Sequence, residues 1–247
     1  MGRISSHYNW HNSGKLVFWD KSTFETTQAH FGFYFYDDFA GADIAIPAAA
    51  SPESGCKWVK KITGAAPPTV VGLADAAGGV MSLNLTADSQ KQEAGLYMND
   101  QRNFDVSKGL IFETKLAAVL PTDVAEAQWG LAGDYAEGGD NITYSLWFDI
   151  DGSGAVNCAK DDNATDQLVS SGLTILADVF HIYRIDCTDV TDIKFFIDGV
   201  EYCATTAFPY TATGANAILQ PYFYIYKASG EGVGALYVDY VKIWQNR

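Results

Sequence analysis

Hydrophobic and polar residues alternate most regularly in the segment HIYRIDCTDVTDIKFFIDGVEYC, residues 181–203. Ile193, Phe195 and Ile197 fall on one face of an extended chain, because side chains in a strand alternate with a period of two. The Asp-Gly pair 198–199 then precedes another alternating run. Such a pair predicts a hairpin, since a type I′ turn needs positive φ at both central residues. The segment therefore predicts a ribbon of two or three antiparallel strands.

The same period of two recurs along the chain. Residues 109–120 alternate over their first half, and helix is the competing interpretation only after Lys115. Other strand-length runs are expected at residues 31–39, 56–63, 80–87, 95–100, 127–135, 141–150, 155–160, 220–228 and 234–244, with a pair of strands around 168–180 after an acidic loop at 161–167. Convincing helical periodicity nowhere exceeds two turns. The pattern predicts an all-β protein, an antiparallel β-sandwich.

Composition supports one large domain. The 247 residues are 48% hydrophobic and 14% aromatic, which is enough for a sizeable core. We expect a polar arm over residues 1–30 and a single domain over residues 31–247. The 16 Lys and Arg residues against 30 Asp and Glu residues give a net charge of −14, so nucleic acid is not an expected partner.

The first residues, MGRISSHYNWHNSG, have no apolar core of a secretory signal. No apolar run approaches the roughly 18–20 residues of a membrane span, so no membrane partner is expected. Cys56, Cys158, Cys187 and Cys203 form no Cys-x-x-Cys pair, which disfavours zinc. We expect production in a cytosol and reduced, mostly buried thiols, although Cys187 and Cys203 flank the ribbon and could face each other.

The segment 1–30 spreads large aromatic residues among polar ones. One interpretation is an arm that docks on another subunit, because exposed aromatic side chains supply anchoring area. The other is a first strand folded back on the core of the same chain. The candidates for partner docking are Tyr8, Trp10, Phe18, Trp19 and Phe24.

Four segments together resemble the concanavalin A-like lectin and glucanase jelly rolls, such as laminarinase-type and LamG-like domains. They are YDDF (36–39), GLIFETKL (109–116), YRIDC…IKFFIDGVEYC (183–203) and LYVDYVKIWQ (236–245), and the resemblance extends over about residues 33–245. It implies a concanavalin A-like jelly roll. It implies little about activity, because these strands are structural.

Hydrolases of that family carry Glu-x-Asp-x-x-Glu on one strand, with one glutamate as nucleophile and the other as proton donor. The motif is absent, because no two glutamates of this chain are four or five residues apart. In the segment AQWGLAGDYAEGGD (127–140), Asp134 and Glu137 are three residues apart, and a strand would place them on opposite faces. We therefore expect no enzymatic activity and no catalytic residues.

A second enzyme class is also considered. YIYKASG (224–230) is similar to a strand of jelly-roll polysaccharide lyases. Those enzymes also need a Gln-x-His pair. Of His7, His11, His30 and His181, only His30 has a glutamine two residues before it, Gln28, and this pair lies in the segment 1–30 that is expected to be an arm outside the jelly roll. Ordinary strand residues are the preferred interpretation.

No cofactor is expected, with structural calcium as the one alternative. DIDGSGAVN (149–157) places Asp149 and Asp151 at loop spacings, but the twelfth position is Lys160 where an EF-hand needs Glu. A hairpin turn is the preferred interpretation. Because jelly rolls of this type often carry calcium, Asp37 and Asp38 are further candidates.

These observations leave one preferred function and two alternatives. The preferred hypothesis is a structural or decoration protein on a tailed-bacteriophage particle, located in the virion, docked on a capsid or other virion protein and forming a homo-oligomer. The alternative is a glycan-binding module, with Trp129, Tyr135, Tyr144 and Trp147 as sugar contacts unless they are core residues. A glycoside hydrolase or polysaccharide lyase with an unrecognised site is the second alternative.

Overall fold

The structure is a computed structural model of the chain. It describes residues 6–10, 16–20, 26–28, 32–40, 46–50, 56–74, 76–119, 125–138, 141–150 and 153–247. Within this described part no helix is long and apolar enough to cross a membrane.

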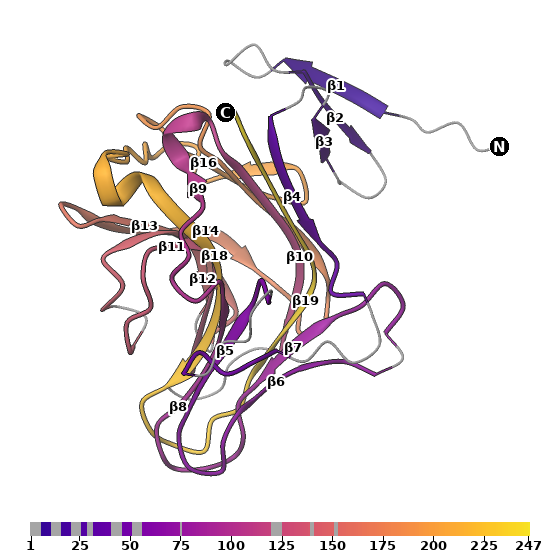
Figure 1. The fold of residues 1–247 in the computed structure, drawn as a ribbon, viewed down its shortest axis with the longest axis vertical. Helices are drawn as coiled ribbons and strands as arrows, with labels where there is room; N and C mark the ends of the chain where they lie inside the picture. Colours follow the sequence, from indigo (N-terminus) through magenta and orange to yellow (C-terminus); the bar gives the residue numbers. More distant parts are fainter. Residues whose placement is uncertain are drawn as a thin grey trace.

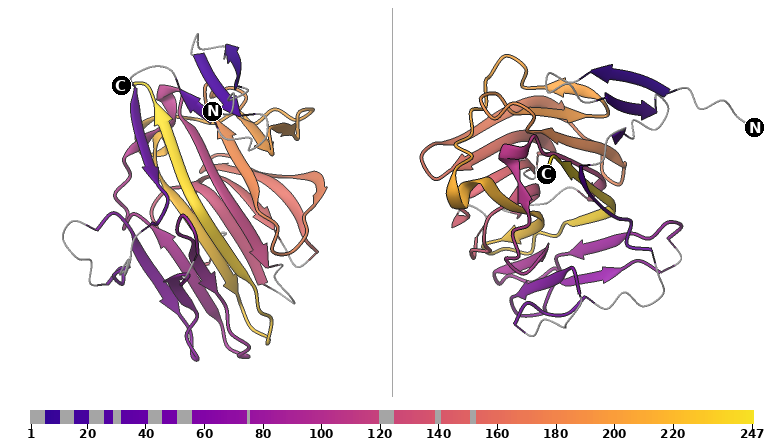
Figure 2. Two further views of the ribbon diagram at one scale, coloured as in Figure 1. Left: turned by 90° about the vertical axis from the view of Figure 1, so that its right-hand side faces the viewer. Right: turned by 45° about the horizontal axis from the view of Figure 1, so that its top comes forward.

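Two large sheets pack face to face, as Figures 1 and 2 show. Sheet I has the order β17-β16-β15-β10-β19-β7-β6, with β4 also paired to β19. Its strands are β4 (Phe33–Asp37), β6 (Thr69–Gly72), β7 (Met81–Asn84), β10 (Ile111–Val119), β15 (His181–Asp186), β16 (Lys194–Ile197), β17 (Val200–Tyr202) and β19 (Ala235–Gln245).

Sheet II has the order β14-β13-β12-β11-β18-β8-β5, with β9 also paired to β18. Its strands are β5 (Val59–Thr63), β8 (Gln92–Tyr97), β9 (Phe104–Asp105), β11 (Ala125–Ala132), β12 (Tyr144–Ile150), β13 (Ala155–Asp162), β14 (Asp166–Thr174) and β18 (Ile218–Lys227). Short 3-10 turns lie at η1 (Val106–Lys108) and η3 (Gly214–Ala217). The predicted antiparallel β-sandwich with a jelly-roll fold is confirmed.

The core lies between the sheets. Trp129 of β11 is fully buried there, with its ring centroid 4.8 Å from that of Tyr183 and stacked on Phe148. Burying an aromatic side chain of this kind contributes about 1.5–3 kcal/mol. Because side chains alternate along a strand, an inward Trp129 places Gln128 and Gly130 on the opposite, outer face of sheet II.

The ribbon over 181–203 forms as predicted. β15 pairs with β16 and β16 with β17, both antiparallel. Asp198 and Gly199 have φ of 50° and 77°, the positive values that a type I′ turn needs. Phe195 and Ile197 are buried in the core. The alternation therefore identified both the strands and the turn correctly.

The expected strand over 109–120 is β10, so the strand interpretation holds over the helix. The expected loop at 161–167 is wrong in its bounds, because β13 continues to Asp162 and β14 starts at Asp166. Asp162 Oδ1 accepts the backbone N–H groups of Ala164 and Thr165, at 3.2 and 2.8 Å, and closes a tight turn. The strand pair expected around 168–180 is likewise wrong, since one strand, β14, covers its start.

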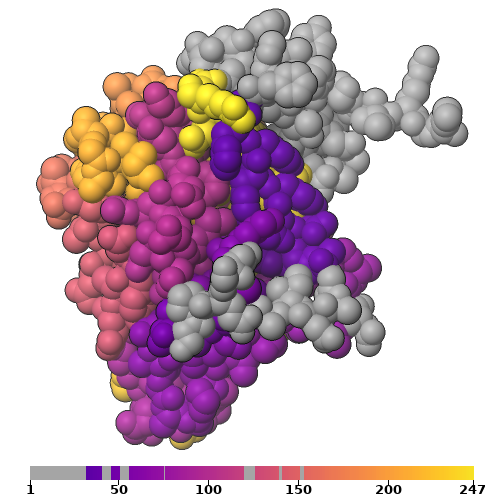
Figure 3. All heavy atoms as spheres, viewed as in Figure 1, coloured from indigo at the N-terminus to yellow at the C-terminus, as the bar shows by residue number. Residues whose placement is uncertain are grey.

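Near the amino terminus the backbone forms a small third sheet of β1 (Ser6–Trp10), β2 (Leu16–Asp20) and β3 (Thr26–Gln28). Further along, β4 pairs with the end of β19, and the two lie side by side in the space-filling view (Figure 3). The division into an arm of residues 1–30 and a domain of residues 31–247 stays a prediction.

Candidate functional site

The outer face of sheet II is ordered by the register of its strands. Gln128 of β11 lies between Tyr224 of β18 and Asp149 of β12. Two residues further along β11, on the same face, Gly130 lies between Tyr222 and Trp147. Polar, acidic and aromatic side chains from distant parts of the chain are therefore brought together on one surface.

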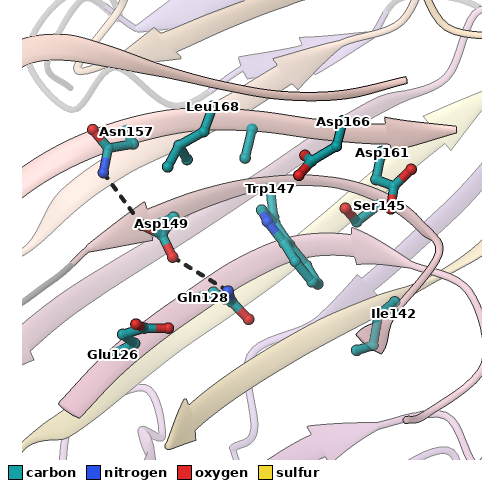
Figure 4. A pocket seen from close by; sticks show the side chains of 11 residues that line it. Glu126, Gln128, Ile142, Ser145, Trp147, Asp149, Asn157, Asp161, Asp166 and Leu168 are labelled. Atoms are coloured by element: carbon teal, nitrogen blue, oxygen red, sulfur yellow. Dashed lines mark hydrogen bonds between the residues drawn. The ribbon is translucent and has the colours of Figure 1, made fainter. Parts of the chain in front are cut away.

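A groove occupies the part of this face that belongs to β11–β14 (Figure 4). It has a volume of about 320 Å³. Its lining residues are Glu126, Gln128, Ile142, Ser145, Trp147, Asp149, Asn157, Ala159, Asp161, Asp166 and Leu168. Four of them are carboxylic acids and none is Lys or Arg, so the groove carries negative charge.

Asp149 is held in place by two amides. Gln128 Nε2 donates to Asp149 Oδ2 at 3.2 Å, and Asn157 Nδ2 donates to Asp149 Oδ1 at 3.3 Å. Both carboxylate oxygens therefore accept a hydrogen bond, and the group is oriented on a rigid strand rather than on a loop.

Gln128 is 4% exposed, and its Oε1 is buried without a hydrogen-bond partner among the described residues. Figure 4 shows Gln128 beside Asp149, with Glu126 next along β11. A buried amide oxygen without a partner costs about 1–3 kcal/mol, so this position favours a ligand or a water that donates to it.

Glu126, like Asp166 at the other end, is an exposed acid of the groove. Since Gln128 is directly opposite Asp149, Glu126 is the diagonal neighbour of Asp149. Diagonal neighbours have Cβ atoms somewhat less than about 7–8 Å apart. This spacing allows the two carboxyl groups to approach the same bond of a ligand.

A second acidic pair lies at the far end of the groove. Asp161 of β13 is directly opposite Asp166 of β14. Burial raises the pKa of Asp161, and the nearby charges of Asp166 and Asp162 raise it further. A hydrogen bond from the Asn163 N–H lowers the pKa but does not cancel the rise. Like charges in direct cross-strand opposition cost stability.

Beside the groove, residues 133–138 cover the β18 and β8 part of the same face. The ring of Tyr135 stacks on Tyr97, with centroids 5.7 Å apart. Tyr135 Oη donates to Glu93 at 2.6 Å, and the backbone N–H of Gly138 donates to the same carboxylate at 3.2 Å. Lys91 Nζ lies 3.2 Å from Glu93, which is fully buried. Burial, and then the bond to Glu93, raise the pKa of Tyr135.

Gly130 sets the separation of β11 and β12 at the centre of this face. A Cβ atom there would lie 2.3 Å from the Leu146 carbonyl oxygen and 2.7 Å from the Cα of Trp147. The close backbone approach therefore requires glycine.

The four predicted sugar contacts divide between the core and the outer face. The prediction of Trp129 as a sugar contact is wrong, because its ring is fully buried between the sheets, where no sugar reaches it. Tyr144 is half-buried and packs against the same core. Tyr135 belongs to the covering segment 133–138, where its ring stacks on Tyr97 and its hydroxyl donates to Glu93. Trp147, 6% exposed, is the candidate that lines the groove.

The calcium candidates are placed apart. Asp37 accepts from Trp58 Nε1 at 3.0 Å and from the Phe39 N–H at 3.0 Å, while Asp38 accepts from the Ala40 N–H at 3.2 Å. Asp149 lies in the groove, and Asp151 is outside the described residues. Among the described residues no group of three or more His, Cys, Asp or Glu side chains is arranged to hold a metal ion.

The docking candidates lie outside the described side chains. Tyr8 and Trp10 are in β1, and Phe18 and Trp19 are in β2, for which only the backbone is described. Phe24 is outside the described residues. Docking through this segment stays a prediction.

Sequence reasoning missed Glu126, Gln128, Asp161 and Asp166 as residues of this site. The stretch considered for catalytic acids began at residue 127, one position after Glu126. The alternation of Glu126, Gln128 and Gly130 on one face was a usable signal for β11. The cross-strand partners could not be identified, because strand register is a long-range property.

No protein-family profile matches the chain, and no curated protein matches its sequence. Many solved structures share its fold, among them three mycobacterial proteins. A glycoside hydrolase family protein from Mycobacterium thermorestibile has a TM-score of 0.55 and 14% identity, covering 85% of this chain and 99% of that one. A beta-1,3-glucanase from Mycobacterium marinum has a TM-score of 0.52 and 17% identity, covering 88% and 100%. A protein of Mycobacterium tuberculosis described as a pseudo beta-1,3-glucanase has a TM-score of 0.52 and 15% identity, covering 86% and 98%.

These neighbours correct the expectation that the protein is not an enzyme. That expectation rested on the absence of one spacing of glutamates along a single strand. The groove shows that carboxylates also meet across strands, where linear spacing does not reveal them. At these identities the likeness itself shows the fold: the chain adopts the concanavalin A-like jelly roll of glucanases.

Proposed function

We propose that the protein is a glycoside hydrolase that binds a polysaccharide in the groove on β11–β14. The observation that carries the proposal is the juxtaposition of Glu126, Asp149 and the partnerless oxygen of Gln128 at one end of this groove. Glycoside hydrolysis needs two carboxyl groups on either side of the scissile bond, one to donate a proton and one to act on the sugar or on water. The fold shared with a glycoside hydrolase family protein and a beta-1,3-glucanase supports the same reaction class.

The two acids suit different roles. Asp149, oriented by Gln128 and Asn157, suits the charged carboxylate that attacks the anomeric carbon or activates water. Glu126, exposed at the groove edge, suits the proton donor to the leaving oxygen. Trp147 supplies an apolar ring edge between the two acidic ends of the groove, where a sugar ring can pack.

The charge of the groove indicates the class of substrate. Glu126, Asp149, Asp161 and Asp166 line it, and no cationic side chain stands among its described lining residues. An anionic polysaccharide such as alginate would be repelled, and its carboxylates would find no Arg or Lys partner. We therefore propose a neutral polysaccharide as the substrate.

The test measures release of reducing ends from neutral β-glucans and from alginate by the full-length protein. We expect turnover of a neutral glucan and none of alginate. Asp149→Asn and Glu126→Gln should each lower kcat at least 100-fold, the usual contribution of a positioned acid or base. Glu201→Gln removes an exposed carboxylate of β17 on the other sheet and serves as the matched control.

Wild-type rates in both groove variants would contradict the assignment of the two acids. Binding of a neutral glucan without any release of reducing ends would contradict hydrolysis. The anomer of the first product distinguishes the two roles of Asp149, since attack on the sugar retains the anomeric configuration and activation of water inverts it.

A further inference from the structure

Two cysteines from opposite sheets meet at one edge of the sandwich. Cys158 belongs to β13 of sheet II, and Cys203 follows β17 of sheet I. Their Sγ atoms are 3.1 Å apart, and both thiols are free. A disulfide has its sulfurs about 2.05 Å apart, so a shift of about 1 Å would bring this pair to bonding distance.

The two thiols differ in access and in acidity. Cys158 is fully buried, whereas Cys203 is half-buried in a turn with a φ of 56°. The contact with Cys203, together with burial, raises the pKa of Cys158. The contact with Cys158 lowers the pKa of Cys203, although burial opposes this. Because the thiolate is the reactive form, Cys203 is the thiol that an external oxidant reaches first.

We propose that Cys158 and Cys203 are a modification site, at which a low-molecular-weight disulfide such as glutathione disulfide oxidises them to an intramolecular bond. The Cys203 thiolate attacks one sulfur of the oxidant, forms a mixed disulfide and releases one glutathione thiolate, which takes up the proton that Cys203 lost. The Cys158 sulfur then attacks Cys203 Sγ, the second glutathione leaves, and it takes the proton of Cys158. Two protein thiols are oxidised, and one glutathione disulfide is reduced to two glutathiones.

This bond would connect the strand beneath the groove to the opposite sheet. Cys158 lies between Asn157 and Ala159, which line the groove from the outer face while the cysteine points into the core. The bond would close a loop of 45 residues, the separation of the two cysteines. Because cross-linking restricts the unfolded chain, oxidation should raise the Tm by about 5–10 °C.

The test incubates full-length protein carrying Cys56→Ser, which removes the exposed thiol, with glutathione disulfide. We expect two of the three remaining thiols to disappear under denaturing conditions, with a mass loss of two hydrogen atoms and one peptide linking Cys158 to Cys203. The Tm should rise, and dithiothreitol should reverse the rise.

The control adds Cys203→Ser to the same protein. This half-buried turn position should tolerate serine, and the variant should keep both thiols, its mass and its Tm in the oxidant. Three remaining free thiols in the Cys56→Ser protein, a stable glutathione adduct on Cys203, or a disulfide to Cys187 would each overturn the proposal. None of these outcomes depends on the proposed hydrolase activity.

Discussion

The outer face of sheet II has two halves that hold their carboxylates differently. In the covered half, Glu93 is fully buried and accepts hydrogen bonds from Tyr135 and the Gly138 N–H beside Lys91. In the open half, Asp149 is partly exposed beside Gln128, whose Oε1 has no partner among the described residues.

The difference separates a structural carboxylate from one available for chemistry. Burying a charge is costly unless it is paired and hydrogen-bonded, and the segment 133–138 supplies those partners to Glu93. In the open half, the side chains of β11–β14 instead line a groove of about 320 Å³. Changes at Glu93, at Tyr135 and at Asp161, the last compared with Asp162, test this difference, from the largest expected effect to the smallest.

Replacing the buried carboxylate should cost the most stability. Glu93→Ala leaves Tyr135 Oη and the Gly138 N–H without their acceptor, so we expect a loss of about 3 kcal/mol in the free energy of unfolding. Asp149→Ala, the matched change in the open half, should cost less than about 1 kcal/mol. Denaturant unfolding of the two variants measures both values, and equal losses would contradict the distinction between the halves.

The hydroxyl of Tyr135 should contribute less than the whole carboxylate. Tyr135→Phe removes one donor to the buried Glu93 and keeps the ring stacked on Tyr97, so we expect a loss of about 1.5–3 kcal/mol. Tyr144→Phe, at a half-buried tyrosine of β12, is the control and should change stability by less than about 0.5 kcal/mol. A smaller loss for Tyr135→Phe than for Tyr144→Phe would show that the covering segment is not held by this bond.

The smallest effect concerns Asp161, at the far end of the open half. Its pKa in the folded protein is raised above 3.8, so the folded state loses stability as the pH rises through that folded pKa. Asp161→Asn should therefore raise the Tm at pH 7 by about 1 °C, a modest gain because the group is largely solvated. Below pH 3.8 the carboxyl is protonated in both states and the gain should vanish.

The adjacent Asp162 should affect the pH dependence of stability in the opposite direction. Burial raises its pKa, but hydrogen bonds from Thr165, Thr211 and Ala164 outweigh burial and leave the pKa below its usual 3.8. Its stabilising contribution is present above pH 3.8 and is lost as the pH falls through the folded value. Asp162→Asn should therefore lower the Tm at pH 7. Melting curves from pH 2 to 7 that shift in the same direction for both variants would contradict these assignments.

Much of the fold follows from local pattern. The alternation of Phe195 and Ile197 and the Asp-Gly turn after them predicted the ribbon correctly, because strand period and turn conformation are properties of neighbouring residues. The bounds predicted for the loop at residues 161–167 were wrong. The acidic composition suggested a loop of seven residues, whereas the Asp162 side chain closes a shorter turn.

The residues of the candidate site could be identified only from the tertiary structure. The sequence by itself determined that Trp129 and Gln128 lie on opposite faces of one strand. It could not determine what each face contacts, and the packing of the two sheets placed Trp129 against Tyr183. The pairing of Gln128 with Asp149, and of Cys158 with Cys203, required strand register and sheet stacking, because these contacts join residues that are distant along the chain.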